Sequence, residues 1–196
     1  MRTGFTLIEI IIAILILSTA IIAVFNIFSV VNILTSDSMD HLIATYLAQE
    51  GMEIVRNIRD TNWLNMDDCA ADPNCANNPS YTWFDGLDSC ANGCEADHTS
   101  TSMLVKTGDP LYNKDGFYGY NQTGASPTKF KRKIIITKVA DVDGKDDHII
   151  KVKVEVSWDA KATLLLSSGG SAGTCGAYNC VTTEETLYDW YNYVNQ

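Results

Sequence analysis

The amino-acid sequence predicts an α+β protein, in which a long N-terminal α-helix packs on a C-terminal antiparallel β-sheet and a disulfide-stapled, loop-rich insert separates the two. Three observations lead to this prediction. Residues 10–36 include no charged side chain, and all six cysteines come later in the chain. The segments 130–140 and 148–158 have the composition of β-strands. A length of 196 residues suits one soluble domain in addition to the helix.

Residues 5–34, the first half of the helix, have the properties of a transmembrane segment. Ile, Leu, Val, Ala and Phe dominate an uncharged run longer than the roughly 20 residues that span a bilayer. Glu9, near the start of this segment, is its one charged residue. A charged residue at full depth costs about 2.5–3.5 kcal/mol, and acids in such segments are usually paired. The sequence therefore predicts a single-pass membrane helix in which Glu9 has a cationic partner.

Three other interpretations fit the apolar run less well than a membrane helix with a paired Glu9. They are a signal peptide, a plain membrane anchor and a buried core helix. A secretory signal peptide would use Arg2 as its basic region and cleave at Ser18-Thr19-Ala20, but the hydrophobicity continues to Val31. A plain membrane anchor explains the length and leaves Glu9 unexplained. A buried core helix of a soluble protein is rarely so long and so apolar. The membrane anchor is the strongest of these alternatives.

Residues 35–60 are predicted to continue the helix with an amphipathic pattern that holds the sheet. The apolar positions at helical spacing are Leu42, Ile43, Tyr46, Leu47, Ile54, Val55 and Ile58. Between them, Arg56 is spaced to form surface ion pairs with Glu53 and Asp60. Gly51 interrupts the pattern at a cost of about 1 kcal/mol relative to alanine, so it marks either a bend or a close contact.

Residues 61–127 form the predicted insert, because Asn, Asp, Gly and Ser are frequent and turn dipeptides such as Asp85-Gly86 recur. Its aromatic side chains either line a ligand-binding surface or anchor the loops on a core, and anchoring is the commoner role. These aromatic residues are Trp63, Trp83, Phe84, Tyr112, Phe117, Tyr118 and Tyr120.

An even number of cysteines outside the helix predicts disulfide bonds in an oxidising compartment. The six are Cys69, Cys75, Cys90, Cys94, Cys175 and Cys180. Six cysteines permit about 15 connectivities, and Cys175 with Cys180 is the first candidate pair because the loop between them is short. A zinc site is the alternative, but no Cys-x-x-Cys pair is present and His98 is the only histidine nearby.

Residues 128–196 are predicted to form the sheet. The strands 130–140 and 148–158 flank the acidic segment 141–147, whose Asp-Gly step predicts a hairpin. In the second strand Val152, Val154, Val156 and Trp158 share one face, which the helix is expected to cover. A last strand ending at Leu187-Tyr188-Asp189-Trp190 completes the sheet. Calcium binding by the acidic loop is an alternative, although the loop lacks the spacing of the helix-loop-helix calcium motif.

The segment Lys129–Lys133 is a basic run that contains one aromatic residue. It is consistent either with a patch for nucleic acid or with a lysine-rich edge strand that resists unwanted pairing. A formal net charge of −10 favours the edge strand, and nucleic acid is not an expected partner.

The motif Gly4-Phe5-Thr6-Leu7-Ile8-Glu9, after a short basic leader, resembles the processing site of type IV pilins and type II secretion pseudopilins. The resemblance implies that residues 1–4 are a leader peptide and that a prepilin peptidase cuts between Gly4 and Phe5 and methylates the new amino group of Phe5. It also implies that Glu9 is the assembly carboxylate, which pairs with the amino terminus of a neighbouring subunit and sets the register of assembly.

The same resemblance implies the partners and the location of the chain. The partners are the prepilin peptidase, an assembly platform with its ATPase, and other pilin subunits. The helix sits in the cytoplasmic (inner) membrane with the head outside, and then enters an extracellular or periplasmic filament. The same-class alternative is a type II secretion pseudopilin. Alternatives of different classes are a binding module that grips a surface, glycan or DNA, and a tethered domain that never polymerises.

No enzyme and no cofactor are expected. His41, His98 and His148 stand in unlike contexts, and no nucleophile, phosphate-loop or paired-histidine metal motif accompanies them.

Overall fold

The structure is a computed structural model, and it describes residues 4, 6–71, 82–88, 90–139, 148–159, 175 and 179–189, with the side chains of the helix described as far as residue 66. The chain divides into two compact units, Met1–Asp40 and His41–Gln196. The first contains the N-terminal half of a long helix, and the second, called here the head, contains both β-sheets.

A single helix, α1 (Leu7–Ala71), accounts for both predicted helical segments. It continues past residue 60, where the sequence pattern predicts its end. The extension is held by tertiary contacts: the Asn62 side chain donates hydrogen bonds to the carbonyls of Trp83 (3.1 Å) and Asp85 (2.9 Å). Trp63 is buried and stacks on Trp83. Packing thus prolongs a helix whose local sequence has lost its apolar periodicity.

The main sheet is antiparallel and has five strands in the order β2-β1-β6-β7-β8. The strands are β1 (Cys94–Glu95), β2 (Leu104–Val105), β6 (Phe130–Lys138), β7 (Ile149–Trp158) and β8 (Cys180–Tyr188). The pairing of β6 with β7 confirms the predicted hairpin, and β8 is the predicted last strand. Residues 141–147, the acidic loop, lie outside the described residues.

A second sheet of three short strands lies within the insert, in the order β4-β3-β5. They are β3 (Tyr112–Lys114), β4 (Phe117–Gly119) and β5 (Ser126–Pro127). Together with β1 and β2, they give the insert more regular structure than the sequence predicted. Strands of two or three residues are too short to show an alternating pattern, so periodicity could not reveal them.

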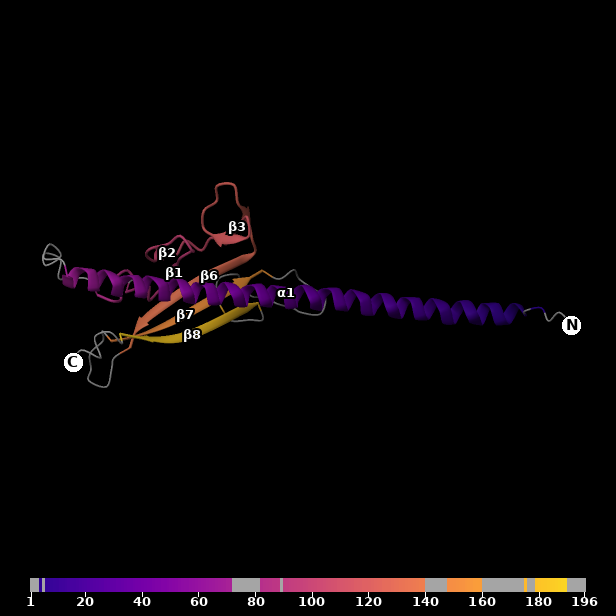
Figure 1. Cartoon of the computed structure of the whole chain (residues 1–196). Helices are drawn as coiled ribbons and strands as arrows, with labels where there is room; N and C mark the ends of the chain where they lie inside the picture. The colour runs from indigo at the N-terminus through magenta and orange to yellow at the C-terminus, as the bar shows by residue number, and fades with distance from the viewer. Residues whose placement is uncertain are drawn as a thin grey trace. The chain divides into compact units, whose positions relative to one another are not determined.

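The core of the head lies between α1 and the inner face of the main sheet, as predicted (Figure 1). Val152, Val154, Val156 and Trp158 are all buried. Two members of the predicted helix stripe, Leu42 and Tyr46, are instead 49% and 63% exposed. The core also takes residues from the helix that the stripe did not include, namely Ala44, Ala48 and Met52. Alanine side chains are short and let helix and sheet approach closely, which shifts the contact face around the helix.

Gly51 marks a close contact between α1 and the sheet. A Cβ atom at this position would lie 2.9 Å from Val154 Cγ1 and 3.0 Å from Arg132 Cδ. Both neighbours are fully buried side chains. The choice between a bend and a contact, which the sequence left open, is therefore decided in favour of the contact.

The position of β6 in the main sheet contradicts the interpretation of Lys129–Lys133 as part of an edge strand. Strand β6 pairs with β7 along its whole length and with β1 at Ile134, so it is an interior strand. Arg132 points into the core, where its Nη1 donates to the Leu47 carbonyl (3.1 Å) and its Nη2 to the Ala96 carbonyl (2.6 Å). Alternation along the strand divides the basic run between two faces, with Arg132 in the core and Lys131 and Lys133 on the outer face.

Arg56 joins the helix to the edge strand β8. Its Nε lies 3.3 Å from Glu185 Oε1 and its Nη2 lies 2.5 Å from Glu185 Oε2, while Nη1 lies 3.0 Å from Glu53. Hydrogen bonds from Arg56 to Glu185 and then to Glu53 raise the pKa of Arg56. The predicted pair with Glu53 is confirmed. Asp60, predicted as the second partner, pairs with Arg59 instead (2.9 Å). Such exposed pairs contribute little stability, about 0–1 kcal/mol each.

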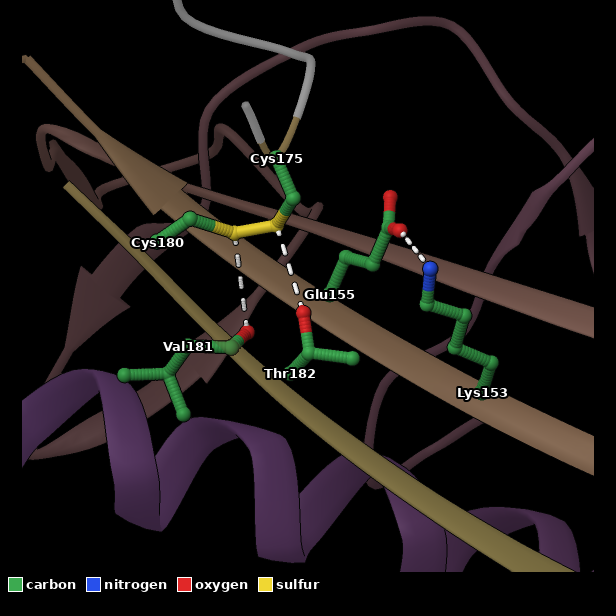
Figure 2. The surroundings of a disulfide bond; sticks show 6 residues. All are labelled: Lys153, Glu155, Cys175, Cys180, Val181 and Thr182. Atoms are coloured by element: carbon green, nitrogen blue, oxygen red, sulfur yellow. Dashed lines mark hydrogen bonds and ion pairs between the residues drawn. A yellow bond between two sulfur atoms is a disulfide. The ribbon is translucent and has the colours of Figure 1, made fainter. Parts of the chain in front are cut away.

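Two of the disulfides fall within the described residues. Cys90 pairs with Cys94 (Cα–Cα 5.2 Å), and Cys175 pairs with Cys180 (Cα–Cα 5.4 Å), which confirms the first candidate pair (Figure 2). The side chain of Cys69 and the whole of Cys75 lie outside the described residues.

The aromatic residues of the insert mostly anchor it, as predicted. Trp63 and Trp83 are buried, and Phe84, Tyr118 and Tyr120 pack partly buried against the core. Phe117 is the exception, being 65% exposed with its ring 5.3 Å from that of His98.

Asp97 fastens the turn after β1 to the small sheet. Its carboxylate accepts hydrogen bonds from the N–H (3.0 Å) and hydroxyl (2.7 Å) of Thr99, the hydroxyl of Ser100 (3.0 Å) and the N–H of Tyr120 (3.2 Å). Burial by itself would raise the pKa of Asp97. The four hydrogen bonds favour the charged form more strongly and hold the pKa below its ordinary value.

A carboxyl group whose pKa is lower in the folded state stabilises the fold above its unfolded pKa, about 3.9, and loses this contribution as the pH falls through the folded value. We expect Asp97→Asn to lower the unfolding free energy by about 1–3 kcal/mol at pH 6, because the amide NH₂ would face donors. The difference from wild type should shrink below about pH 3. Urea unfolding at both pH values measures this, with the exposed Asp88→Asn as control. A loss that is equal at both pH values would contradict the assignment.

Candidate assembly interface

The first half of α1 exposes apolar side chains around its whole circumference. Every Leu, Ile, Val and Phe from Leu7 to Leu34 is at least 37% exposed. Contiguous apolar patches on soluble monomers rarely exceed a few hundred Å², and this surface runs along many helical turns. By length and composition, α1 is one candidate membrane-spanning helix near the N-terminus. Apolar side chains exposed in this way are compatible with a surrounding of lipid or of other apolar helices.

Five hydroxyl groups on this half, those of Ser18, Thr19, Ser29, Thr35 and Ser38, form hydrogen bonds within the helix itself. They donate back to carbonyls one turn earlier: Ser18 to Leu15 (2.9 Å), Ser29 to Phe25 (3.0 Å), Thr35 to Val31 (2.8 Å). A hydroxyl bonded in this way can enter an apolar layer without an outside partner. These residues therefore leave the apolar character of the surface intact.

Glu9 is the single charged residue on this surface before Asp37. It lies in the first turn of α1, where its N–H donates to the Thr6 carbonyl (3.1 Å), and its side chain is exposed. The helix N-terminus carries a partial positive charge that favours an acid there, but this is only about half an elementary charge. Among the described residues, no basic side chain lies within ion-pair distance of the Glu9 carboxylate.

The predicted scissile pair falls only partly within the described residues. Gly4 is exposed just before the helix, and Phe5 lies outside them. Cleavage and methylation at this pair remain predictions.

Among the described residues of the head, the histidines and acidic residues form no comparable site. In the part of the chain that the structure describes, no group of three His, Cys, Asp or Glu residues gathers as a metal site. His41 packs edge-on against Trp158 with ring centroids 4.8 Å apart, and His98 lies on the surface beside Phe117. The arrangement that stands out is thus the apolar helix half with its one carboxylate.

No protein-family model, no characterised protein and no solved structure matches this chain. The layout of one long apolar N-terminal helix followed by an antiparallel-sheet head is compatible with that of pilin-like proteins.

Proposed function

We propose that this chain is a type IV pilin-like structural subunit that is processed after Gly4 and polymerised through α1 into an extracellular or envelope filament. The observation that carries the proposal is Glu9, the one carboxylate on an exposed, otherwise uncharged helix surface. Cleavage before Phe5 would create an amino group in the same apolar layer. The amino group of one subunit would then pair with Glu9 of its neighbour.

This pair would determine the register in which the helices of neighbouring subunits align. Apolar helices that leave lipid for a helix bundle exchange one apolar environment for another, so hydrophobicity gives little preference for any particular alignment. An unpaired charge in that bundle is costly, and only the alignment that joins carboxylate and ammonium avoids the cost. The filament would thus have a core of α1 helices and an outside surface of acidic, disulfide-bonded heads.

The membrane would hold the subunit before assembly, the prepilin peptidase would process it, and an assembly platform with its ATPase would extract it to join other pilin subunits. Filaments of this kind serve adhesion, motility or DNA uptake. A short type II secretion pseudofilament would use the same helix geometry, and the neighbouring genes distinguish the two.

Processing and export are tested by the intact mass and N-terminal sequence of the protein from sheared surface material and from membranes, with and without the prepilin peptidase. We expect a chain of 192 residues, 196 minus the four leader residues, that starts at methylated Phe5 in the sheared fraction. Deletion of the peptidase should leave the full chain in the membrane. A chain that starts at Met1 and occurs only in membranes in both strains would overturn the proposal in favour of a tethered domain.

A further inference from the structure

A small pocket opens on the outer face of the main sheet, on the side away from α1. Its volume is about 90 Å³. The floor comes from β6 and β7, and the walls come from the segment after β2 and from Cys175. The charged side chains that line it on this face are Lys106, Lys131, Lys133, Glu95, Glu155 and Asp109.

The strand register gathers two of the lysines on this face. Lys131 lies opposite Ser157 and Lys133 lies opposite Glu155, and residues two apart on a strand point to the same side. Lys106 joins them from the segment that follows β2. All three lysines are half-buried at the pocket.

The carboxylates beside these lysines are largely engaged elsewhere. Glu155 Oε1 lies 2.7 Å from Lys153 Nζ. Glu95 is buried, and it accepts hydrogen bonds from the N–H groups of Thr107 (3.1 Å) and Gly108 (2.8 Å) and from the Thr107 hydroxyl (2.8 Å). Asp109 remains exposed at the rim.

Within the described residues, no carboxylate lies within 4.0 Å of the ammonium groups of Lys106, Lys131 or Lys133. In this part of the chain, the three lysines therefore share the pocket with the carboxylates of Glu95, Glu155 and Asp109, but none of their ammonium groups is held by a carboxylate at ion-pair distance. The carboxylates of the lining offset part of the repulsion among the lysines, and an oxyanion within reach of the three ammonium groups would pair with them directly.

The wall at Cys175 is tied covalently to the sheet. The Cys175–Cys180 disulfide joins this residue to the start of β8, and the Thr182 hydroxyl lies 3.5 Å from Cys175 Sγ (Figure 2). Figure 2 also shows Glu155 and Lys153 on the same face as this disulfide, with the helix ribbon on the other side of the strands. The pocket is thus bounded by a sheet and a cross-link, and a ligand would find it already formed.

We propose that this pocket binds the anionic group of an acidic sugar, with the ammonium groups of Lys106, Lys131 and Lys133 as its donors. A carboxylate on a uronic acid and a phosphate on a sugar present the same oxyanion to these lysines. Ser157 and Asp109 supply partners for sugar hydroxyls, so a ligand that carries both an anionic group and hydroxyl groups fits the lining.

The size of the pocket and the charge of the chain disfavour a polymer that is read along its backbone. Sites for drug-sized ligands occupy about 300–1,000 Å³, and this pocket is large enough only for a single charged group. Single-stranded nucleic acid is usually held along a basic groove with stacked aromatic residues, and no aromatic residue among those described lines this pocket.

Binding at this pocket would not depend on filament assembly.

The test is calorimetric titration of the full chain in non-ionic detergent with galacturonate, glucose 6-phosphate and neutral galactose. The variant K131Q/K133Q removes two pocket lysines, and K114Q/K151Q removes the same charge at positions outside the pocket. We expect saturable binding of at least one anionic sugar and no binding of galactose. Affinity should fall at least tenfold in K131Q/K133Q and change less than twofold in K114Q/K151Q. Preference for galacturonate identifies a carboxylate ligand, and preference for glucose 6-phosphate identifies a sugar phosphate.

Three results would overturn the proposal: no saturable binding of either anion, equal weakening in both double variants, or binding of galactose as strong as that of the anions. A short single-stranded oligonucleotide that binds more tightly than the sugars, and loses affinity in K131Q/K133Q alone, would instead assign the site to nucleic acid. Near-ultraviolet circular dichroism of both variants checks that the head remains folded.

Discussion

Glu9→Ala is expected to abolish filament assembly while the protein still accumulates in the membrane. Removal of one partner from a buried ion pair leaves the other charge uncompensated and typically costs about 3–5 kcal/mol. Each 1.4 kcal/mol is a factor of about ten in an equilibrium constant, so subunit association should weaken by more than a hundredfold. Glu9→Gln should fail as well, because it keeps the shape of the side chain and removes the charge. Quantitative immunoblots of sheared filaments against total membrane protein measure the effect.

Ser29→Ala is the matched control for this experiment. Its hydroxyl lies on the same exposed helix half and donates to the Phe25 carbonyl of its own helix (3.0 Å), so its loss should leave assembly at the wild-type level. Assembly of Glu9→Ala at the wild-type level would show that the carboxylate has no part in the register of a filament. Absence of the wild-type chain itself from sheared filaments would instead favour a membrane-tethered domain.

Gly51→Leu is expected to destabilise the head by about 3 kcal/mol or more. The added side chain would enter the space held by Val154 Cγ1 and Arg132 Cδ, which lie 2.9 Å and 3.0 Å from the position of a Cβ atom. Overpacking of a core costs about 1–3 kcal/mol and at times more. Gly51→Ala should lose less, because alanine gains about 1 kcal/mol of helix propensity that offsets part of the collision. Urea unfolding of the full chain in detergent, followed by tryptophan fluorescence, gives the free energies.

Gln49→Ala is the control for this series, because it lies two residues earlier in α1 with an exposed side chain. We expect a change within about 0.5 kcal/mol. If Gly51→Ala proved more stable than wild type, helix and sheet would have to move apart readily, and the close contact would not limit the residue at position 51.

Local sequence patterns predicted much of this fold. The uncharged run predicted the helix half, and the alternation of Val152, Val154 and Val156 predicted a strand with one buried face. The short loop between Cys175 and Cys180 predicted their disulfide. Each of these patterns depends on residues close together in the chain, so the sequence displays it directly.

The wrong predictions concern residues whose partners are distant in the sequence. The helix passes residue 60 because Asn62 and Trp63 find partners in the segment around Trp83. Arg132 is buried because the carbonyls of Leu47 and Ala96 accept its hydrogen bonds from distant elements. Neither set of partners lies near in sequence, so periodicity and propensity could not anticipate them.

Glu9 and the lysine pocket also differ in whether the sequence alone could reveal them. Glu9 could be singled out from the sequence because a charge inside an apolar run is anomalous wherever the run folds. The lysine pocket could not be, since Lys106, the β6 lysines and Cys175 meet only through the sheet register and the segment after β2.

By itself, the sequence determined that the chain has an apolar N-terminal helix with one carboxylate, a β-sheet with one buried face and disulfides beyond the helix, because hydrophobic periodicity and composition act locally. Only the tertiary structure decided which face of the helix meets the sheet, why position 51 is glycine and where the basic residues point. These outcomes depend on close packing and on hydrogen-bond partners that chain folding brings from distant segments.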